Sequence, residues 1–405
     1  MKIDKCRHIF GMILGGMMLL MSSCDKEAVS VEQEESFLKY YPLGTEDNTG
    51  TRVIRRSDGY AILCNFENSS GQEDILVVFT DRFGRRTGES DPTAEPQLNK
   101  SGYNMISLDG GYLICGTSDD DLLPQRSGYL INISGDGTIL WEKRYRGYAG
   151  LEFRDVILAD DGSLVMTGSV SRNDRPDAEV MLFKTNAQGD SSWIKDWRYA
   201  GNDVGESIIE YDGFYHVLVT NTDVGYSSIR VFYATAPDAR AGFNKDLPEE
   251  HLSGADIARD QEGRIFVLAN QQDPANRLSM IYLAELELQE TAGGKQMAIV
   301  KTNIIPDPDG GSLLSASFIL VGGDMLVIGG SWRKTSQGDL DILFLEVDND
   351  FQIMGEKKTF GAKTEQAAQD IIATTDGGYA LTGSVDLGGG KTTMLLKINQ
   401  DKELK

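Results

Sequence analysis

The sequence predicts an all-β fold of repeated four-stranded antiparallel units, and three observations lead to this prediction. A turn of the Asp-Gly type recurs along the 405 residues, apolar runs flank each turn, and no ten-residue helical pattern separates them. The last glycines of successive turns are 50 to 60 residues apart. The copies are Asp58-Gly59, Asp109 to Gly111, Asp161-Gly162, Asp212-Gly213, Glu262-Gly263, Gly322-Gly323 and Asp376 to Gly378.

Each copy has the same parts. An apolar strand precedes the turn, and a second strand after it ends in small residues, as in Tyr379 to Ser384. A polar loop leads to a strongly apolar third strand, such as Met394 to Leu396, and a more polar fourth strand follows, such as Ile139 to Tyr145. The inner strands are almost continuously apolar, so both faces of each sheet must be covered. Stacked sheets at this period predict a seven-bladed β-propeller, with six or eight blades as the alternatives.

The two ends of the chain predict how the ring closes. The last copy runs out at Lys405 before a fourth strand can form, whereas Phe37 to Tyr41 precedes the first copy and has fourth-strand character. We therefore expect the N-terminal strand to complete the last blade, because such pairing removes an exposed sheet edge. Residues 37–405 would then form one propeller domain.

The N-terminus has the order of an export signal. Lys2, Lys5 and Arg7 precede an uncharged apolar run over residues 9–21, which is too short to span a bilayer. The small residues before Cys24 resemble a bacterial lipobox, which implies that residues 1–23 are a signal peptide and that Cys24 is lipidated. Residues 24–36 are polar and acidic and are expected to act as a tether.

Two segments resemble exported proteins of the Bacteroidetes group. Asp25 to Glu27 is similar to the acidic stretch behind the lipid cysteine of surface-exposed lipoproteins, and Thr375 to Ser384 is similar to the Thr-x-Asp-Gly-Gly-Tyr repeat of exported propellers. The resemblance implies a cell-envelope, outer-membrane lipoprotein at the cell surface. In enterobacteria an Asp directly after the lipidated Cys implies retention at the inner membrane instead. The sequence therefore does not decide which of the two membranes holds the lipid anchor. The resemblance concerns fold and address, and propellers host many functions.

Composition limits the chemistry. The formal net charge of −23 disfavours nucleic acid and an anionic membrane surface as partners. Only His216 and His251 remain after residue 23, so we expect no His-based metal site or triad. No cofactor is predicted. Ca²⁺ is the one ion considered, at acidic clusters that lack the spacing of a known calcium loop, namely Asp119 to Asp121, Asp307 with Asp309, and Asp339 with Asp341.

No catalytic residue is predicted. Ser134 to Trp141 is similar to the Asp-box turn of sialidases and other propeller glycoside hydrolases, in which the box is structural. This resemblance implies that Asp136 bonds amides of its own turn and that Trp141 packs between blades. A sialidase also needs an arginine cluster, a Tyr nucleophile and an acid/base Asp brought together, and spacing alone does not show this.

The candidate ligand-binding residues lie in loops that should share one face. Loops between second and third strands, and those joining blades, emerge around the funnel of a propeller. Trp332 follows a strand end and opens a polar loop, so we expect it to be a stacking platform. Arginines nearby would add positive charge for an anionic glycan or an acidic protein segment. The full set is Arg126, Tyr148, Arg172, Tyr226, Trp332 and Arg333, and each could equally anchor its own loop.

Together these features predict a monomeric, membrane-anchored lipoprotein whose non-enzymatic propeller is a binding or scaffold module for a glycan or an envelope protein. The alternative is a glycoside hydrolase or polysaccharide lyase that uses carboxylates near the funnel. Asp and Glu total 62 and occur in every loop, so the sequence does not single out a catalytic pair.

Overall fold

The computed structural model describes residues 36–43, 47–90, 98–120, 123–240, 242–275, 277–292, 294–361 and 363–404. The predicted signal peptide at 1–23, Cys24 and nearly all of the tether at 24–36 lie outside the described residues. The described part of the chain consists of β-strands and their connections and contains no helix that could cross a membrane.

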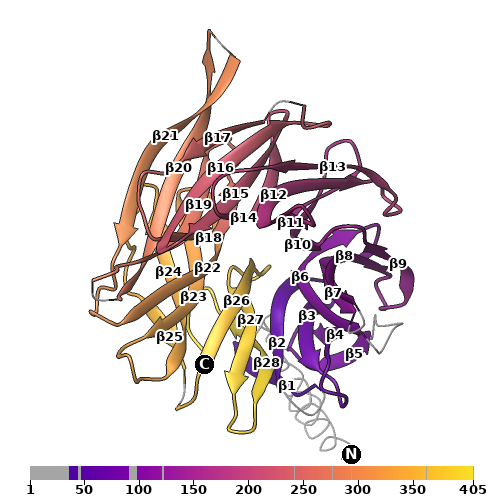
Figure 1. Cartoon of the computed structure of the whole chain (residues 1–405). Coiled ribbons are helices and arrows are strands. Elements are labelled where there is room, and N and C mark those ends of the chain that lie inside the picture. Colours follow the sequence, from indigo (N-terminus) through magenta and orange to yellow (C-terminus); the bar gives the residue numbers. More distant parts are fainter. Residues whose placement is uncertain are drawn as a thin grey trace, which may run out of the picture.

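Most of the described strands form five antiparallel sheets of four (Figure 1). Within four of these sheets, consecutive strands pair in chain order, which short connections favour. Three of the four are β2 (Asn48–Arg55), β3 (Gly59–Glu67), β4 (Glu73–Asp81), β5 (Arg86–Ser90); β6 (Leu98–Leu108), β7 (Gly111–Asp120), β8 (Leu123–Ile133), β9 (Ile139–Tyr145); β10 (Gly150–Leu158), β11 (Leu164–Arg172), β12 (Arg175–Thr185), β13 (Ser191–Trp197). The next is β14 (Asn202–Tyr211), β15 (Phe214–Asp223), β16 (Tyr226–Thr235), β17 (Gly242–Asp246).

A sixth sheet has eight strands in two antiparallel halves. A single parallel pair, Ser279 with Leu313, joins the halves. In the first half β20 and β21 form a long hairpin, which is the lengthened fifth copy of the repeat. The halves are β18 (Leu252–Arg259), β19 (Ile265–Gln272), β20 (Ser279–Thr291), β21 (Gly294–Ile305); and β22 (Leu313–Gly322), β23 (Met325–Arg333), β24 (Leu340–Asp348), β25 (Lys358–Phe360).

The remaining sheet joins the two ends of the chain. It runs β26 (Gln366–Ala373), β27 (Tyr379–Asp386), β28 (Lys391–Ile398) and then β1 (Phe37–Tyr41) at its edge. Phe37 pairs with Lys397 and Tyr41 with Thr393, and Figure 1 shows indigo β1 beside yellow β28. The prediction that Phe37–Tyr41 is the fourth strand of the last sheet is confirmed.

The first strands of the sheets contact one another in a closed cycle. The contacts run from β2 through β6, β10, β14, β18, β22 and β26 back to β2. A ring of radially arranged antiparallel sheets is a β-propeller, so the all-β propeller prediction is confirmed. The antiparallel order places the Asp-Gly turns at one end of the ring, here named the turn end. It places the loops between sheets, and those between second and third strands, at the other end, here named the mouth end.

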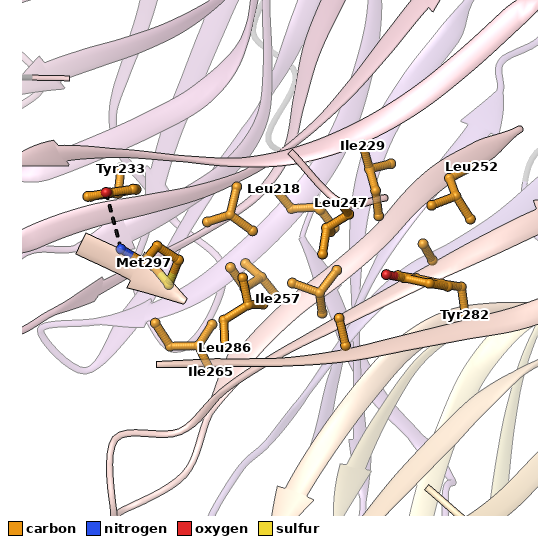
Figure 2. Close-up of a cluster of buried hydrophobic side chains, with 14 residues drawn as sticks. Leu218, Ile229, Tyr233, Leu247, Leu252, Ile257, Ile265, Tyr282, Leu286 and Met297 are labelled. Atoms are coloured by element: carbon orange, nitrogen blue, oxygen red, sulfur yellow. Dashed lines mark hydrogen bonds between the residues drawn. The ribbon is translucent and has the colours of Figure 1, made fainter. Parts of the chain in front are cut away.

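The core lies between neighbouring sheets. Figure 2 shows one such cluster, in which Leu218 and Tyr233 of one sheet face Ile257 and Leu286 of the next. The backbone N–H of Met297 donates to the Tyr233 hydroxyl at 3.2 Å, so the long hairpin is tied to the neighbouring sheet. Both faces of the inner strands are covered, which explains their continuous apolar runs.

The Asp-box resemblance holds at the level of the turn. The carboxylate of Asp136 accepts the backbone N–H of Thr138 at 3.2 Å. Trp141 packs against the cluster that contains Leu164 and Met166 of the next sheet. Both structural roles expected for this segment are therefore confirmed.

Candidate functional site

Every first strand carries a β-bulge at an equivalent place, and the bulges organise the centre of the ring. The pairing register shifts between Gly102 and Asn104 in β6 and between Ala368 and Asp370 in β26, and equivalent shifts occur in the other five first strands. In four sheets the residue opposite the bulge is a glycine, and at Gly116 a Cβ would lie 1.9 Å from the carbonyl oxygen of Ser101. This is why small residues recur at the ends of the second strands. The other three sheets have Cys64, Val219 and Ala269 opposite the bulge.

Six of the seven residues that directly follow the bulges are polar and form a belt around the axis, and Phe318 of β22 is the exception. Arg52 donates to Asn104 Oδ1 at 2.7 Å and to Asp370 Oδ1 at 3.0 Å. Asn104 donates in turn to Asp155, and the Ser207 hydroxyl bridges Asp155 at 3.0 Å and Asp256 at 2.9 Å. The belt thus links sheets far apart in the sequence.

Belt carboxylates also accept backbone N–H groups from the neighbouring first strand. Asp370 accepts the N–H of Val53 at 2.8 Å, Asp155 accepts that of Ile208 at 2.8 Å, and Asp256 accepts that of Ile319 at 3.1 Å. Because buried amides need partners, these bonds hold the sheets in register with one another.

The belt holds more carboxylates than guanidinium groups. Burial raises the pKa of Asp256 to about 6, although the charge of Arg52 opposes the shift. Burial also raises the pKa of Asp370. Burial lowers the pKa of Arg52, but the surrounding carboxylates outweigh it and raise that pKa overall. The belt is therefore a structural element in which burial opposes the ionisation of Asp256 and Asp370, and its residues directly follow the bulged residues along the first strands.

A second cluster lies on the mouth side of the belt. The bulged residues of β6, β10 and β14 are Tyr103, Arg154 and Glu206, from consecutive sheets. The Arg154 guanidinium lies 4.6 Å from the centre of the Tyr103 ring and pairs with Glu152. Arg126 reaches the other oxygen of Glu152 at 3.0 Å. This set of Tyr103, Arg126, Glu152, Arg154 and Glu206 is here named the mouth cluster.

The two glutamates of the mouth cluster have different environments. Glu152 is 9% exposed and is held by two guanidinium groups. Burial raises the pKa of Glu206, with the Thr220 hydroxyl and Arg154 opposing and Glu152 reinforcing the shift. Burial and then the charge of Glu152 raise the pKa of the Tyr103 hydroxyl, which the arginines oppose. A glutamate that pairs with two guanidinium groups therefore lies near a second glutamate whose pKa is raised by burial.

A cavity of about 530 Å³ opens at the same end of the ring. Thr51, the bulged residue of β2, lines it, and the Thr51 hydroxyl lies 3.4 Å from the carbonyl oxygen of Gly102, next to Tyr103. Amide, carboxylate and aromatic side chains line the rest, among them Asn65, Phe66 and Glu73. Its size and mixed lining suit a small ligand such as one or two sugar rings.

The structure places the predicted Trp332 half-buried at the mouth end of β23. Its indole N–H donates to Asp307 at 2.5 Å, and the ammonium group of Lys357 lies 3.9 Å from its ring centre. Lys357 and Asp307 form an ion pair in which both side chains are less than 5% exposed. The neighbouring Arg333 pairs with Glu365 at 2.8 Å.

The other predicted binding residues lie in different sheets. Arg172 pairs with Asp196 at 2.5 Å and lies 5.7 Å from the ring centre of Tyr148, so these two residues are neighbours. Tyr226 begins β16 and is 40% exposed. Arg126 alone of the predicted set belongs to the mouth cluster.

Sequence reasoning did not single out Tyr103, Glu152, Arg154 or Glu206. Tyr103, Arg154 and Glu206 precede the last glycine of their turns by seven or eight residues, a shared offset that could have indicated them. The bulge hides the pattern, because one extra residue reverses the side to which a strand residue points. Among the described residues, no group of three or more His, Cys, Asp or Glu side chains could hold a metal ion.

Comparisons with known proteins relate this fold to enzymes. No family model matches the chain. No curated protein matches it either. Hydrazine synthase of Kuenenia stuttgartiensis is similar in structure, at 12% identity and a TM-score of 0.51, over 87% of this chain and 96% of that one. A prolyl endopeptidase is similar at 13% identity and a TM-score of 0.50, over 88% of this chain and 48% of the other.

The polysaccharide lyase Uly1 is also similar, at 13% identity and a TM-score of 0.44, over 87% of this chain and 90% of that one. Such identities show a shared fold alone. The prediction of a non-enzymatic binding or scaffold module is corrected here, because hydrazine synthase and the prolyl endopeptidase, the two similar structures with TM-scores of 0.50 or more given above, are enzymes. The enzymatic alternative has the better support.

Proposed function

We propose that this protein is a glycan-cleaving enzyme, a glycoside hydrolase or polysaccharide lyase, that acts at the mouth end of the propeller. One observation carries the proposal: the mouth cluster combines two carboxyl groups whose surroundings differ. Glycoside hydrolysis needs a protonated carboxyl and an ionised one on either side of the scissile bond. Burial raises the pKa of Glu206, and the guanidinium groups of Arg126 and Arg154 both pair with Glu152.

In the proposed reaction, Glu206 donates its proton to the leaving oxygen as the glycosidic bond breaks. The Glu152 carboxylate faces the developing positive charge on the sugar and stabilises it or activates water. Arg126 and Arg154 act as positioning residues for Glu152. The cavity of about 530 Å³ at the same end of the ring supplies amides and hydroxyls for sugar hydroxyl groups and Phe66 for ring stacking.

Tyr103 supports the lyase as a second candidate. Its hydroxyl lies beside two arginines, which could neutralise a uronate carboxylate. Tyr103, as the phenolate, would take the proton from the sugar carbon and pass it to the leaving oxygen as the glycosidic bond breaks. The products separate the two reactions, since hydrolysis releases a saturated reducing end whereas elimination creates a carbon–carbon double bond that absorbs in the ultraviolet.

The test is a polysaccharide panel assayed for reducing ends and for unsaturated product. We expect activity on at least one glycan, and Glu206→Gln should lower kcat by about 10² or more while the melting temperature stays unchanged. Glu210→Gln is the matched control, because Glu210 lies on the same strand near the turn end and its carboxylate accepts the Asp160 N–H at 2.7 Å. No activity across the panel, or equal loss in both variants, would contradict the proposal.

We also propose that the ring has seven blades. The single parallel pair in the eight-stranded sheet supports counting its halves as two blades, and the closed cycle of first strands supports the same number. An experimental structure with six or eight blades would contradict this count.

We further propose that the mature protein is a monomeric lipoprotein of the outer membrane, anchored through Cys24 and exposed at the cell surface. The lipobox before Cys24 and the acidic residues after it support this address. Cys24→Ala should move the protein from the membrane fraction to the soluble fraction. Continued partitioning with membranes without loss of acyl label would contradict it.

A further inference from the structure

An arginine-rich pocket lies at the turn end, at the opposite end of the ring from the mouth cluster. It has a volume of about 400 Å³ and is formed by the β2–β3 turn, the β4–β5 turn and the last sheet. Arg55, Arg56 and Arg82 line it together with Thr374 and Thr375. Three guanidinium groups around one hollow suit a ligand with several anionic oxygens.

The arginines differ in how firmly they are held. Arg56 donates to Asp58 at 2.9 Å and to the carbonyl oxygen of Gly135 at 3.0 Å, and it lies 4.6 Å from the ring centre of Phe79. Arg56 is therefore a fixed wall of the pocket. Arg55 and Arg82 are exposed at its rim.

The local charge is positive on a strongly acidic chain. Arg85, in the same turn as Arg82, is also exposed, and both guanidinium groups lie over the ring of Phe83, at 5.4 Å and 4.7 Å from its centre. Asp81 stabilises this turn, because one of its carboxylate oxygens accepts the backbone N–H groups of Phe83 and Arg85. Four arginines thus lie close together at this turn end, near Asp58 and Asp81, whereas the whole chain has a net charge of −23.

The pocket is next to the point where the N-terminal segment leaves the domain. β1 runs antiparallel to β28 and begins at Phe37, which pairs with Lys397 near the turn end. The β4–β5 turn packs on β1, since the Tyr41 hydroxyl donates to the carbonyl oxygen of Gly84 at 2.7 Å and a Cβ at Gly84 would collide with Phe37. The 13 residues of the tether can span at most about 45 Å. A membrane anchor at Cys24 would therefore keep this pocket within reach of the lipid surface.

We propose that this pocket, formed by Arg55, Arg56, Arg82 and the neighbouring Arg85, binds phosphate-bearing headgroups of an anionic membrane and turns the turn end toward the lipid. Guanidinium forks match phosphate oxygens and attract a negative lipid surface. The surrounding acidic surface is repelled by the same lipid, so the pocket decides the orientation. The net charge of the whole chain disfavours binding to an anionic membrane. The arginines gathered at this pocket reverse that expectation locally. The inference is independent of the proposed enzymatic activity.

The test is vesicle binding by the chain from residue 24 with Cys24→Ser, which keeps every described residue and has no lipid. Phosphatidylcholine vesicles are compared with vesicles that also contain phosphatidylglycerol. We expect binding only to the anionic vesicles, weakened as salt rises. The double variant Arg55→Glu and Arg82→Glu should bind about tenfold or more weakly, with an unchanged melting temperature, because both side chains are exposed.

The control is the double variant Arg146→Glu and Arg240→Glu, which changes the net charge equally at exposed positions outside the pocket. It should bind the anionic vesicles nearly as well as the parent chain. Equal loss in both double variants would overturn the proposal, because net charge would then explain binding. Equal binding to neutral vesicles, or binding of inorganic phosphate without binding of vesicles, would overturn it as well.

Discussion

The two ends of the propeller are built from the same strands but differ in regularity. At the turn end, a lysine on the third strand ties down the Asp of the Asp-Gly turn in two sheets: Lys184 donates to Asp161 at 2.6 Å, and Lys397 donates to Asp376. At the mouth end, the bulged residues differ from sheet to sheet. The comparison indicates that repeated residues stabilise the fold at the turn end. At the mouth end, the bulged positions can differ between sheets and provide functional side chains.

Removing β1 should have the largest effect on stability, because β1 completes the last sheet and so joins the N-terminal part of the chain to the C-terminal part. Deletion of residues 25–41 exposes the edge of β28 and removes Tyr41, which is 4% exposed. We expect aggregation or a melting temperature lower by about 10 °C or more, measured by circular dichroism. Deletion of residues 25–34 alone should leave the melt unchanged. An unaltered melt for the longer deletion would show that closure does not stabilise the ring.

The belt between the two ends should give the next largest effect, as a dependence on pH. The pKa of Asp256 is raised to about 6, so the folded protein binds a proton there that the unfolded chain releases between about pH 4 and pH 6. The stabilising contribution of this proton is present at low pH and is lost as pH rises through 6. The predicted change in the free energy of unfolding is about 3 kcal/mol.

Denaturant titrations from pH 4 to pH 7.5 measure this effect against Asp256→Ala. In the variant, the backbone N–H groups of Ile257 and Ile319 lose their acceptor, which lowers the free energy of unfolding by the same amount at every pH. The variant also lacks the carboxyl group that titrates. The stability gap between the parent chain and the variant should therefore shrink as pH rises. A gap that is constant across this range would mean that Asp256 is already ionised at pH 4.

Trp332→Ala tests whether the mouth end also contains residues that only stabilise the fold. The indole packs against buried apolar residues and bonds Asp307, so its removal should lower the free energy of unfolding by about 2–3 kcal/mol. Glycan turnover should stay unchanged if Trp332 only anchors its loop. Reduced turnover with a constant melt would instead make it the stacking platform that the sequence suggested.

Lys397→Met should have the smallest effect and tests the turn end. The Lys397 side chain is fully buried, and although burial acts to raise the pKa of Asp376, the Lys397 ammonium and the Thr374 hydroxyl hold it below its usual range. Losing this pair should cost about 1–2 kcal/mol in urea unfolding. Lys143→Met is the control, since its pair with Asp190 is largely exposed and should contribute less than about 0.5 kcal/mol. Equal losses would remove the distinction between buried and exposed ties.

Much of the architecture could be predicted because it repeats. The Asp-Gly turns, the small residues after the second strands and the strand character of Phe37–Tyr41 are each local signals. The turn at Asp136 and the packing of Trp141 could also be predicted from the sequence, because both residues belong to one short segment. Local chemistry determines such features wherever the segment lies in the fold.

The candidate sites depend on the tertiary structure. Tyr103, Arg154 and Glu206 are about 50 residues apart in sequence, and the ring brings them together at one end. The two arginine-containing turns of the basic pocket, at residues 55–58 and 81–85, meet only because β2, β3 and β4 pair. The sequence by itself determined which strands and turns exist, because propensity and periodicity act over a few residues. Which charges become neighbours was decided by closure of the ring, because electrostatic interactions depend on distance in space rather than along the chain.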